Sequence, residues 1–320
     1  MEEAAALSRR YEKLERTQAK APAPRKAGEL KSRLPEKLFL VAAVTALAVG
    51  LAVSANLLSP ELPAPLDNGI PSIFAREPEN PYAELYYYEA DKQQRYEAYQ
   101  AAHEELAAED VVWQVNAGLD HDFYTEVTTV SDVDALPLIV NKYHQLPEGY
   151  VPADLQKLPS GKPATKATCA AYKAMAADAR KAGLSLYAAS AYRSYDLQKR
   201  LYNGYLQREK GDTAKVDTYS ARPGHSEHQT GRAIDLCGSF GSLNDFVNTP
   251  ESPWINENCY KYGFIVRYQQ DIVPLTGYKY EPWHITYVGT EVSQAMHDLQ
   301  IRCLEEYVVK YIDHQPPDEV

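Results

Sequence analysis

The sequence of 320 residues predicts an α+β fold, with helices packed around a small antiparallel sheet and a transmembrane helix ahead of them. Three observations carry this prediction. Two short stretches, 232–236 and 284–288, alternate polar and apolar residues as half-buried strands do. Longer stretches of good helix formers flank them. Near the N-terminus, 21 successive residues carry no charge, which is enough for a helix that crosses a bilayer.

The N-terminal region divides into a tail and an anchor. Residues 1–37 form a basic tail with ten Lys or Arg and six Asp or Glu, and residues 38–58 form the predicted transmembrane anchor. This charge balance predicts a cytoplasmic N-terminus, so that the rest of the chain lies outside the cell membrane as part of a single-pass protein. A cleaved signal peptide is the competing interpretation, because 53–55 holds small residues that signal peptidase accepts. The 37-residue basic tail ahead of the apolar stretch favours the anchor over a signal peptide.

The exported part is strongly acidic. The whole sequence has a net charge of −11, and removing the tail's surplus of four positive charges leaves −15 on the remainder. Nucleic acid would be repelled by such a surface. The composition therefore excludes a nucleic-acid partner.

Two accessory segments precede the main domain. Residues 59–81 contain six prolines and form a predicted extended linker. Residues 82–128 form a predicted helical stalk or arm, in which 84–109 is rich in Ala, Glu, Gln and Tyr and is interpreted as one helix. Its tyrosines could stack on sugars, although packing against the main domain is the interpretation we favour.

Residues 129–313 form the predicted main domain. Thr165 can cap a helix that runs to Ala182, and the pattern then predicts a strand and a second helix. A third, interrupted helix, another strand and a last helix complete the domain. The ranges of these five elements are 184–189, 195–208, 244–262, 264–267 and 291–311.

Two histidines and one aspartate form a predicted metal centre. A catalytic zinc takes three imidazole or carboxylate ligands and leaves a fourth position for water, whose pKa falls to about 7. Asp235 stands in an apolar strand, where a charge is costly unless it is paired or bound to a metal. The sequence therefore predicts Zn²⁺ as the cofactor, held by His228, Asp235 and His284.

Glu281 is the predicted general base. A glutamate beside a ligand can take the proton from the water without binding the metal itself. Glu281 and His284 are three residues apart and would face opposite sides of a regular strand. We therefore expect a turn or bulge near Pro282 that brings both to the metal.

These motifs resemble a known family. The pattern Ser226-x-His228 with Gly231-x-Ala233-x-Asp235, followed by Glu281-x-Trp283-His284, resembles the LAS metallopeptidases, named for lysostaphin, D-Ala-D-Ala carboxypeptidase and sonic hedgehog. It is most similar to their VanY-like D-alanyl-D-alanine carboxypeptidase branch. Further matches lie at 138–155, 190–198 and 283–289, and the resemblance covers roughly 115–309. It implies a hedgehog/D,D-peptidase-type fold.

The resemblance also assigns substrate-binding residues. Arg193 would hold the C-terminal carboxylate of a peptidoglycan stem peptide or help to polarise the scissile carbonyl, and a guanidinium is suited to a bidentate grip. A structural salt bridge is the alternative role for this arginine. The further candidates are Gln198, Ser226, Ser190 and Trp283.

Four cysteines, Cys169, Cys237, Cys259 and Cys303, leave two possibilities open. In an oxidising compartment they can pair, with Cys237 joined to Cys259 and Cys169 to Cys303 as one arrangement. Buried free thiols are the other possibility.

The resemblance implies a zinc-dependent D-alanyl-D-alanine carboxypeptidase that removes the terminal D-Ala from peptidoglycan stem peptides. An L,D-carboxypeptidase that acts on tetrapeptide stems shares the same zinc residues and stays open as an alternative. A non-catalytic wall-binding module is a more distant one. The presence of Glu281 together with all three ligands argues against that last interpretation.

Overall fold

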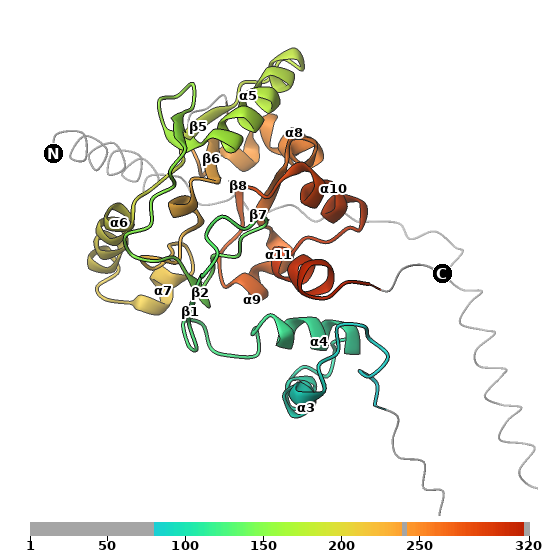
Figure 1. The fold of residues 1–320 in the computed structure, drawn as a ribbon. Coiled ribbons are helices and arrows are strands. Elements are labelled where there is room, and N and C mark those ends of the chain that lie inside the picture. Colours follow the sequence, from blue (N-terminus) through green and yellow to red (C-terminus); the bar gives the residue numbers. More distant parts are fainter. Residues whose placement is uncertain (1–79, 239–241, 317–320) are drawn as a thin grey trace, which may run out of the picture. The chain divides into compact units, whose positions relative to one another are not determined.

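A four-stranded antiparallel sheet organises the described part of the chain (Figure 1). This computed structural model describes residues 80–238 and 242–316. The strand order is β5–β6–β8–β7, and two small two-stranded sheets pair β1 with β2 and β3 with β4. The strand bounds are β1 (Thr128–Thr129), β2 (His144–Gln145), β3 (Leu155–Lys157), β4 (Pro163–Thr165), β5 (Tyr187–Ser190), β6 (Ala233–Cys237), β7 (Phe264–Tyr268) and β8 (Glu281–Tyr287).

Short helices surround this sheet, so the α+β architecture agrees with the prediction. In chain order they are η3 (Ala90–Lys92), α3 (Gln93–Ala102), α4 (Ala108–Asn116), α5 (Lys166–Lys181), α6 (Tyr195–Arg208), α7 (Thr213–Asp217), η4 (Glu227–Thr230), η5 (Phe246–Asn248), α8 (Glu251–Asn258), η6 (Cys259–Tyr262), η7 (Gln270–Ile272), α9 (Val273–Thr276), α10 (Thr290–Asp298), α11 (Leu304–Tyr307) and η8 (Val308–Asp313). The label η marks 3₁₀-helices, except that η8 is a π-helix.

The structure corrects the expected fold class, which included a transmembrane helix. Residues 38–58 lie outside the described residues, and within 80–238 and 242–316 no helix has the length and apolar character needed to cross a bilayer. The longest helix there, α5, has 16 residues and several charged side chains, whereas a span needs about 20 apolar residues. The fold class of the described residues is therefore α+β.

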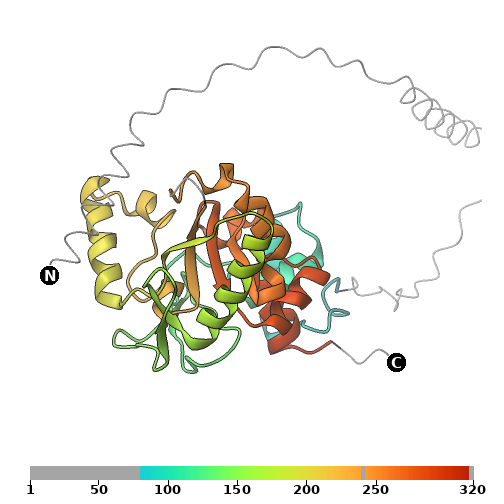
Figure 2. The same cartoon turned by 90° about the horizontal axis from the view of Figure 1, so that it is seen from above.

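The sheet has one apolar face and one polar face. Ile234 of β6, Ile285 of β8 and Val266 of β7 belong to the main hydrophobic core, which also contains Met175 of α5 and Ile255 of α8. Helices α5 and α8 therefore cover this face, and Figure 2 gives the view from above. Because side chains alternate along a strand, the intervening residues of β6 and β8 point to the other face.

The predicted irregularity near Pro282 is present. In the antiparallel pair of β7 and β8, Val266 lies opposite Ile285, but Tyr268 lies opposite Glu281. A step of two residues along β7 thus corresponds to a step of four residues along β8. This bulge breaks the strict alternation between Glu281 and His284, so that both can serve the same side of the sheet.

The N-terminal arm consists of two helices where one was predicted. Helix α3 ends at Ala102, where the side chain of Gln100 donates hydrogen bonds to the carbonyls of His103 and Leu106 and stabilises the break. Helix α4 then begins at Ala108. The division of the chain at residue 128 stays a prediction.

The arm packs against the rest of the described chain through its own apolar cluster. Tyr96 and Trp113 of the arm share this cluster with Ile272 of η7 and with Val309 of η8. In Figure 1 α4 lies between α3 and the C-terminal helices. The packing interpretation of the arm's tyrosines is therefore the one that the structure supports.

Elsewhere the predicted helices are partly correct. The side chain of Thr165 accepts a hydrogen bond from the Thr168 amide and begins α5, and α6 spans the predicted 195–208. The predicted last helix, 291–311, is broken into α10, α11 and η8, with Gln300 in the left-handed region between the first two. All four cysteines are buried free thiols, which is the second of the two possibilities left open by the sequence.

We predict that docking of the arm contributes to the stability of the protein. Ile272 is buried in the arm cluster, so Ile272→Ala should lower the free energy of unfolding by about 2–5 kcal/mol, through lost burial and the cavity left behind. Urea unfolding followed by circular dichroism measures this change. The control is Val247→Ala at an exposed position, which should change the free energy by less than about 0.5 kcal/mol. Equal effects of the two variants would contradict the docking of the arm.

Candidate metal centre

Three predicted ligands meet on the polar face of the sheet. His228, Asp235 and His284 are buried, and their donor atoms lie within 4.8 Å of one another. The Nε2 of His228 is 3.1 Å from Oδ2 of Asp235, and the Nδ1 of His284 is 3.1 Å from Oδ1. The two carboxylate oxygens therefore each face one imidazole.

Backbone geometry brings these residues together. Asp235 of β6 and His284 of β8 are direct partners in the antiparallel register. His228 belongs to the short η4 helix just before β6. Gly231 joins the two elements with φ +69°, a left-handed conformation that costs other residues strain, and a Cβ there would lie 3.0 Å from Leu155.

The ring of His228 is oriented as a ligand would be. Its Nδ1–H donates a hydrogen bond to the carbonyl of Ala191 at 2.6 Å, while Nε2 is buried without a hydrogen-bond partner. Burial and the nearby Arg193 lower the pKa of His228 to about 4, so Nε2 is unprotonated at neutral pH. A lone pair facing a carboxylate at 3.1 Å is repulsive unless both bind a cation. This donor set therefore fits a divalent metal ion.

His284 has a different protonation behaviour. Burial opposes its charged form, but hydrogen bonds with Asp235 and Glu227 outweigh burial and raise its pKa to about 9. Asp235 stays ionised, because His228 and His284 hold its pKa well below the usual value despite burial. Two imidazoles and one carboxylate are a ligand set typical of catalytic zinc sites, which retain a position for water.

Glu281 lies beside this cluster. Its Oε2 is 3.8 Å from Nδ1 of His284, and its side chain is 15% exposed. Burial, opposed by the nearby His284, raises the pKa of Glu281 to about 7. A carboxyl group with this pKa can both accept and release a proton at neutral pH.

Arg193 approaches the cluster from the end of β5. Its amide donates a hydrogen bond to the carbonyl of His228, which links the two segments. One terminal guanidinium nitrogen is 3.9 Å from Oδ2 of Asp235, and the side chain keeps 21% of its surface exposed. Its buried Nε has no hydrogen-bond partner. The group is thus a partly accessible cation beside the donor cluster.

The other predicted substrate residues have different positions. Ser190 lies opposite Asp235 across β5 and β6, and Ser226 is buried directly before η4. Gln198 is buried on α6, where its amide nitrogen donates to the Ala221 carbonyl and its Oε1 has no partner. Trp283 packs against the main core on the apolar face, so the structure does not bring it to the cluster.

Glu227 is a site residue that the sequence interpretation missed. It stands between Ser226 and His228, it is fully buried, and its Oε2 lies 3.2 Å from Nε2 of His284. The available signal was an acidic residue directly before a predicted ligand, but the partners of Glu227 come from distant segments.

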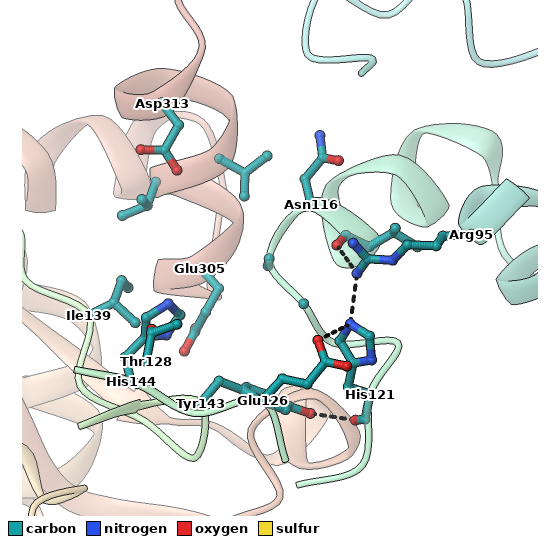
Figure 3. Close-up of a pocket in the computed structure, with 15 residues that line it drawn as sticks. Arg95, Asn116, His121, Glu126, Thr128, Ile139, Tyr143, His144, Glu305 and Asp313 are labelled. Atoms are coloured by element: carbon teal, nitrogen blue, oxygen red, sulfur yellow. Dashed lines mark hydrogen bonds and ion pairs between the residues drawn. The ribbon is translucent and has the colours of Figure 1, made fainter. Parts of the chain in front are cut away.

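One cavity among the described residues lies away from the three predicted ligands. It has a volume of about 400 Å³ and lies between the arm and the C-terminal helices (Figure 3). Arg95 and His121 line it from the arm, and His144 and Glu305 from the main domain. None of the three predicted ligands lines it. The chemistry is therefore assigned to the donor cluster and not to this cavity.

Comparison with known proteins relates this arrangement to one family. Residues 162–290 match the profile of the VanY family, described as D-alanyl-D-alanine carboxypeptidase. This range contains Arg193, Glu281 and all three predicted ligands.

Individual relatives of this chain also carry the names of carboxypeptidases. YodJ of Bacillus subtilis (strain 168), named as a carboxypeptidase, is 37% identical over 194 residues, which are 57% of this chain and 70% of the relative. A D-alanyl-D-alanine carboxypeptidase of Enterococcus faecium is 36% identical over 64% of this chain and 61% of its own length. The solved structure of the LdcB LD-carboxypeptidase has a TM-score of 0.52 and 36% identity, over 57% of this chain and 90% of that one.

Loss of one ligand should abolish tight metal binding. Asp235→Asn removes the charge that both imidazoles face, so the zinc affinity should fall more than about 100-fold, beyond the 10–100-fold cost of altering a group that only supports a ligand. Competition with a chromophoric chelator measures the affinity. Asp298→Asn, on the exposed part of α10, is the control and should bind zinc as the wild type does. Unchanged affinity in Asp235→Asn would refute the proposed ligand set.

The raised pKa of His284 predicts a particular pH dependence. Below its pKa of about 9 the ring carries a proton that zinc must displace, so the apparent affinity should fall about tenfold per pH unit from pH 8.5 to 7. An imidazole with an ordinary pKa of about 6.5 would give a nearly flat profile in this range. Titrations in a non-coordinating buffer distinguish the two, and a flat profile would contradict protonation of His284 in the metal-free protein.

Proposed function

The chain belongs to the VanY family of D-alanyl-D-alanine carboxypeptidases and is a zinc metallocarboxypeptidase, and from this premise we propose that it removes the terminal D-alanine of peptidoglycan stem peptides. The observation that carries the proposal is the meeting of His228, Asp235 and His284 beside Glu281. These are the groups that metal-assisted peptide hydrolysis requires.

His228, Asp235 and His284 would hold the zinc ion. When bound, zinc supplies a Lewis acid that lowers the pKa of a water molecule to about 7 and polarises a carbonyl oxygen. The protein's own task is to present two unprotonated imidazole nitrogens and one ionised carboxylate. The hydrogen bond from Nδ1 of His228 to the Ala191 carbonyl serves that task, because it leaves Nε2 of His228 unprotonated.

Glu281 would transfer the protons of the reaction. As a carboxylate it takes the proton from the attacking water, and as the acid it gives that proton to the amine of the departing D-alanine. Its pKa of about 7 supports both steps, because each form is well populated at neutral pH. Its distance of 3.8 Å from His284 keeps it beside the ligands.

Arg193 would bind the carboxylate at the end of the stem peptide. Its guanidinium is partly exposed and has donors available, and it stays close to Asp235 at 3.9 Å. A planar guanidinium holds a carboxylate through two parallel hydrogen bonds. Ser190, opposite Asp235 across β5 and β6, and Ser226, two residues before His228, are candidates for further hydrogen bonds to the substrate, while the buried Oε1 of Gln198 can act only as an acceptor.

This substrate implies a place of action. Peptidoglycan lies outside the cytoplasmic membrane, so we infer that the catalytic domain works on that outer side. The strongly acidic composition of the sequence is compatible with a substrate other than nucleic acid.

An L,D-carboxypeptidase is the second candidate. The LdcB LD-carboxypeptidase is 36% identical to this chain and similar in fold, so the family similarity alone does not choose between the last D,D bond of a pentapeptide and the last L,D bond of a tetrapeptide. We favour the D,D activity because the family profile and the Enterococcus faecium relative carry that description.

Release of D-alanine from matched stem peptides tests the activity. The zinc-loaded chain should release D-alanine from the pentapeptide much faster than from the tetrapeptide. Glu281→Gln should lower this rate by about 10²–10⁴-fold, because the proton carrier is lost, while zinc stays bound. Glu291→Gln, exposed on α10, is the matched control and should keep full activity.

Two results would contradict the proposal. Preference for the tetrapeptide would replace the D,D activity by the L,D activity. Full activity of the Glu281→Gln variant would remove Glu281 from its role as general base.

A further inference from the structure

We propose that Glu227 is a positioning residue, which fixes the His284 ring for metal binding, and that a buried chain of charges through Arg267 and Glu305 holds Glu227 in place. The inference rests on the proposed role of His284 as a metal ligand. It concerns residues that make no contact with substrate in this account.

The two nitrogens of His284 face different partners. Nδ1 lies 3.1 Å from Oδ1 of Asp235, on the side of the donor cluster, while Nε2 lies 3.2 Å from Oε2 of Glu227. A ligand nitrogen must offer a lone pair, so the ring proton of metal-bound His284 belongs on Nε2. There it donates to the Glu227 carboxylate, which selects the tautomer and fixes the ring plane.

Glu227 is itself held on both oxygens. Oε2 accepts a hydrogen bond from the hydroxyl of Thr286 at 2.5 Å, and Oε1 accepts one from Nε of Arg267 at 2.8 Å. The carboxylate therefore has little freedom to rotate. Since Glu227 and His228 are neighbours in η4, one short helical turn supplies a ligand and also the support of another ligand.

Arg267 extends this chain of charges away from the cluster. It is 1% exposed and donates to both oxygens of Glu305, at 3.1 and 2.6 Å. Glu305 in turn accepts a hydrogen bond from the side chain of Asn141 at 3.0 Å. Asn141 belongs to the 138–155 match with the VanY-like branch, and the chain of charges gives this residue a physical role.

The outer end of the chain reaches the cavity beside the arm. Figure 3 shows Glu305 among the cavity residues, with His144 nearby on the same side. His144 also contacts Asn141, whose Oδ1 lies 3.0 Å from its Nδ1. The buried charges thus run from the cavity wall through Arg267 to the polar face of the sheet.

Stability alone is a poor explanation for these charges. Removing carboxylates and a guanidinium from water costs several kcal/mol per ion, and well-packed apolar residues often stabilise a core as well or better. Glu227, Arg267 and Glu305 form a chain of three buried ions that ends at the predicted ligand His284. Positioning of this ligand explains the chain better than stability does. The test must therefore separate metal binding from folding.

The decisive variant is Glu227→Gln in the whole chain, which removes the charge but keeps the size of the side chain. Zinc affinity, measured by chelator competition, should fall about 10–100-fold, as expected for loss of a group that orients a ligand. In the zinc-loaded wild type, ¹⁵N NMR of the histidine rings should show the His284 proton on Nε2.

Glu251→Gln is the matched control. Glu251 is also fully buried, but its Oε1 accepts a hydrogen bond from the Ser185 amide. This variant can lose stability, yet its zinc affinity should stay within about threefold of the wild type. If Glu227→Gln does not fold, Thr286→Val removes the hydroxyl that holds Glu227 and should still weaken zinc binding.

Three outcomes would overturn the inference. They are wild-type zinc affinity in Glu227→Gln or in Thr286→Val, an equal loss in Glu251→Gln, and a ring proton on Nδ1 of zinc-bound His284. Failure of the ligand set on which this inference rests gives a different pattern, since His284→Ala would then bind zinc as tightly as the wild type. Failure of the proposed activity would show in the release of D-alanine and not in these zinc affinities.

Discussion

The pairing of Asp235 with His284 across β6 and β8 is the constraint on which the site depends. Direct partners in an antiparallel pair place their side chains on the same face, a few ångströms apart. A slip of one residue would turn one of the two toward the apolar core. Ile234 and Ile285, buried in that core, secure the register from the other face. The hydrophobic core therefore sets the geometry of the polar cluster.

The two faces of the sheet have different roles. One face packs against α5 and α8 and excludes water, while the other gathers charged groups that would be costly if they were isolated. Each of these groups has an opposite charge or a hydrogen-bond donor beside it, as Glu227 has in Arg267. Bulges near Pro282 and at the end of β5 adjust the strands so that Glu281 and Ser190 approach the cluster. The bulges and the regular strand pairing thus together bring the site residues to one cluster.

Much of this could be predicted from the sequence because the decisive signals are local. Alternation around Asp235 and His284 predicted the two strands and their faces, Thr165 predicted the start of α5, and the parity of Glu281 and His284 predicted a bulge. The break between α3 and α4 was not predicted. The residues there favour a helix by composition, and the composition does not indicate the side-chain hydrogen bonds of Gln100 that stabilise the break.

Long-range contacts account for the other differences. The partners of Glu227 come from β7 and β8, far along the chain, so no spacing rule could reveal them. Trp283 was a candidate substrate residue through the resemblance, but neighbours in a strand face opposite sides, so it packs against the core while His284 faces the cluster. The choice between disulfides and free thiols stayed open for a similar reason, since an even number of cysteines says nothing about their distances.

Anomalous X-ray diffraction at the zinc edge, from crystals of the zinc-loaded protein, tests the central claim most directly. We predict a single strong peak from one zinc ion that is bonded to Nε2 of His228, to the carboxylate of Asp235 and to Nδ1 of His284, with bond lengths of about 2.0–2.2 Å. A zinc ion held by other residues, or bonded to Nε2 of His284, would contradict it.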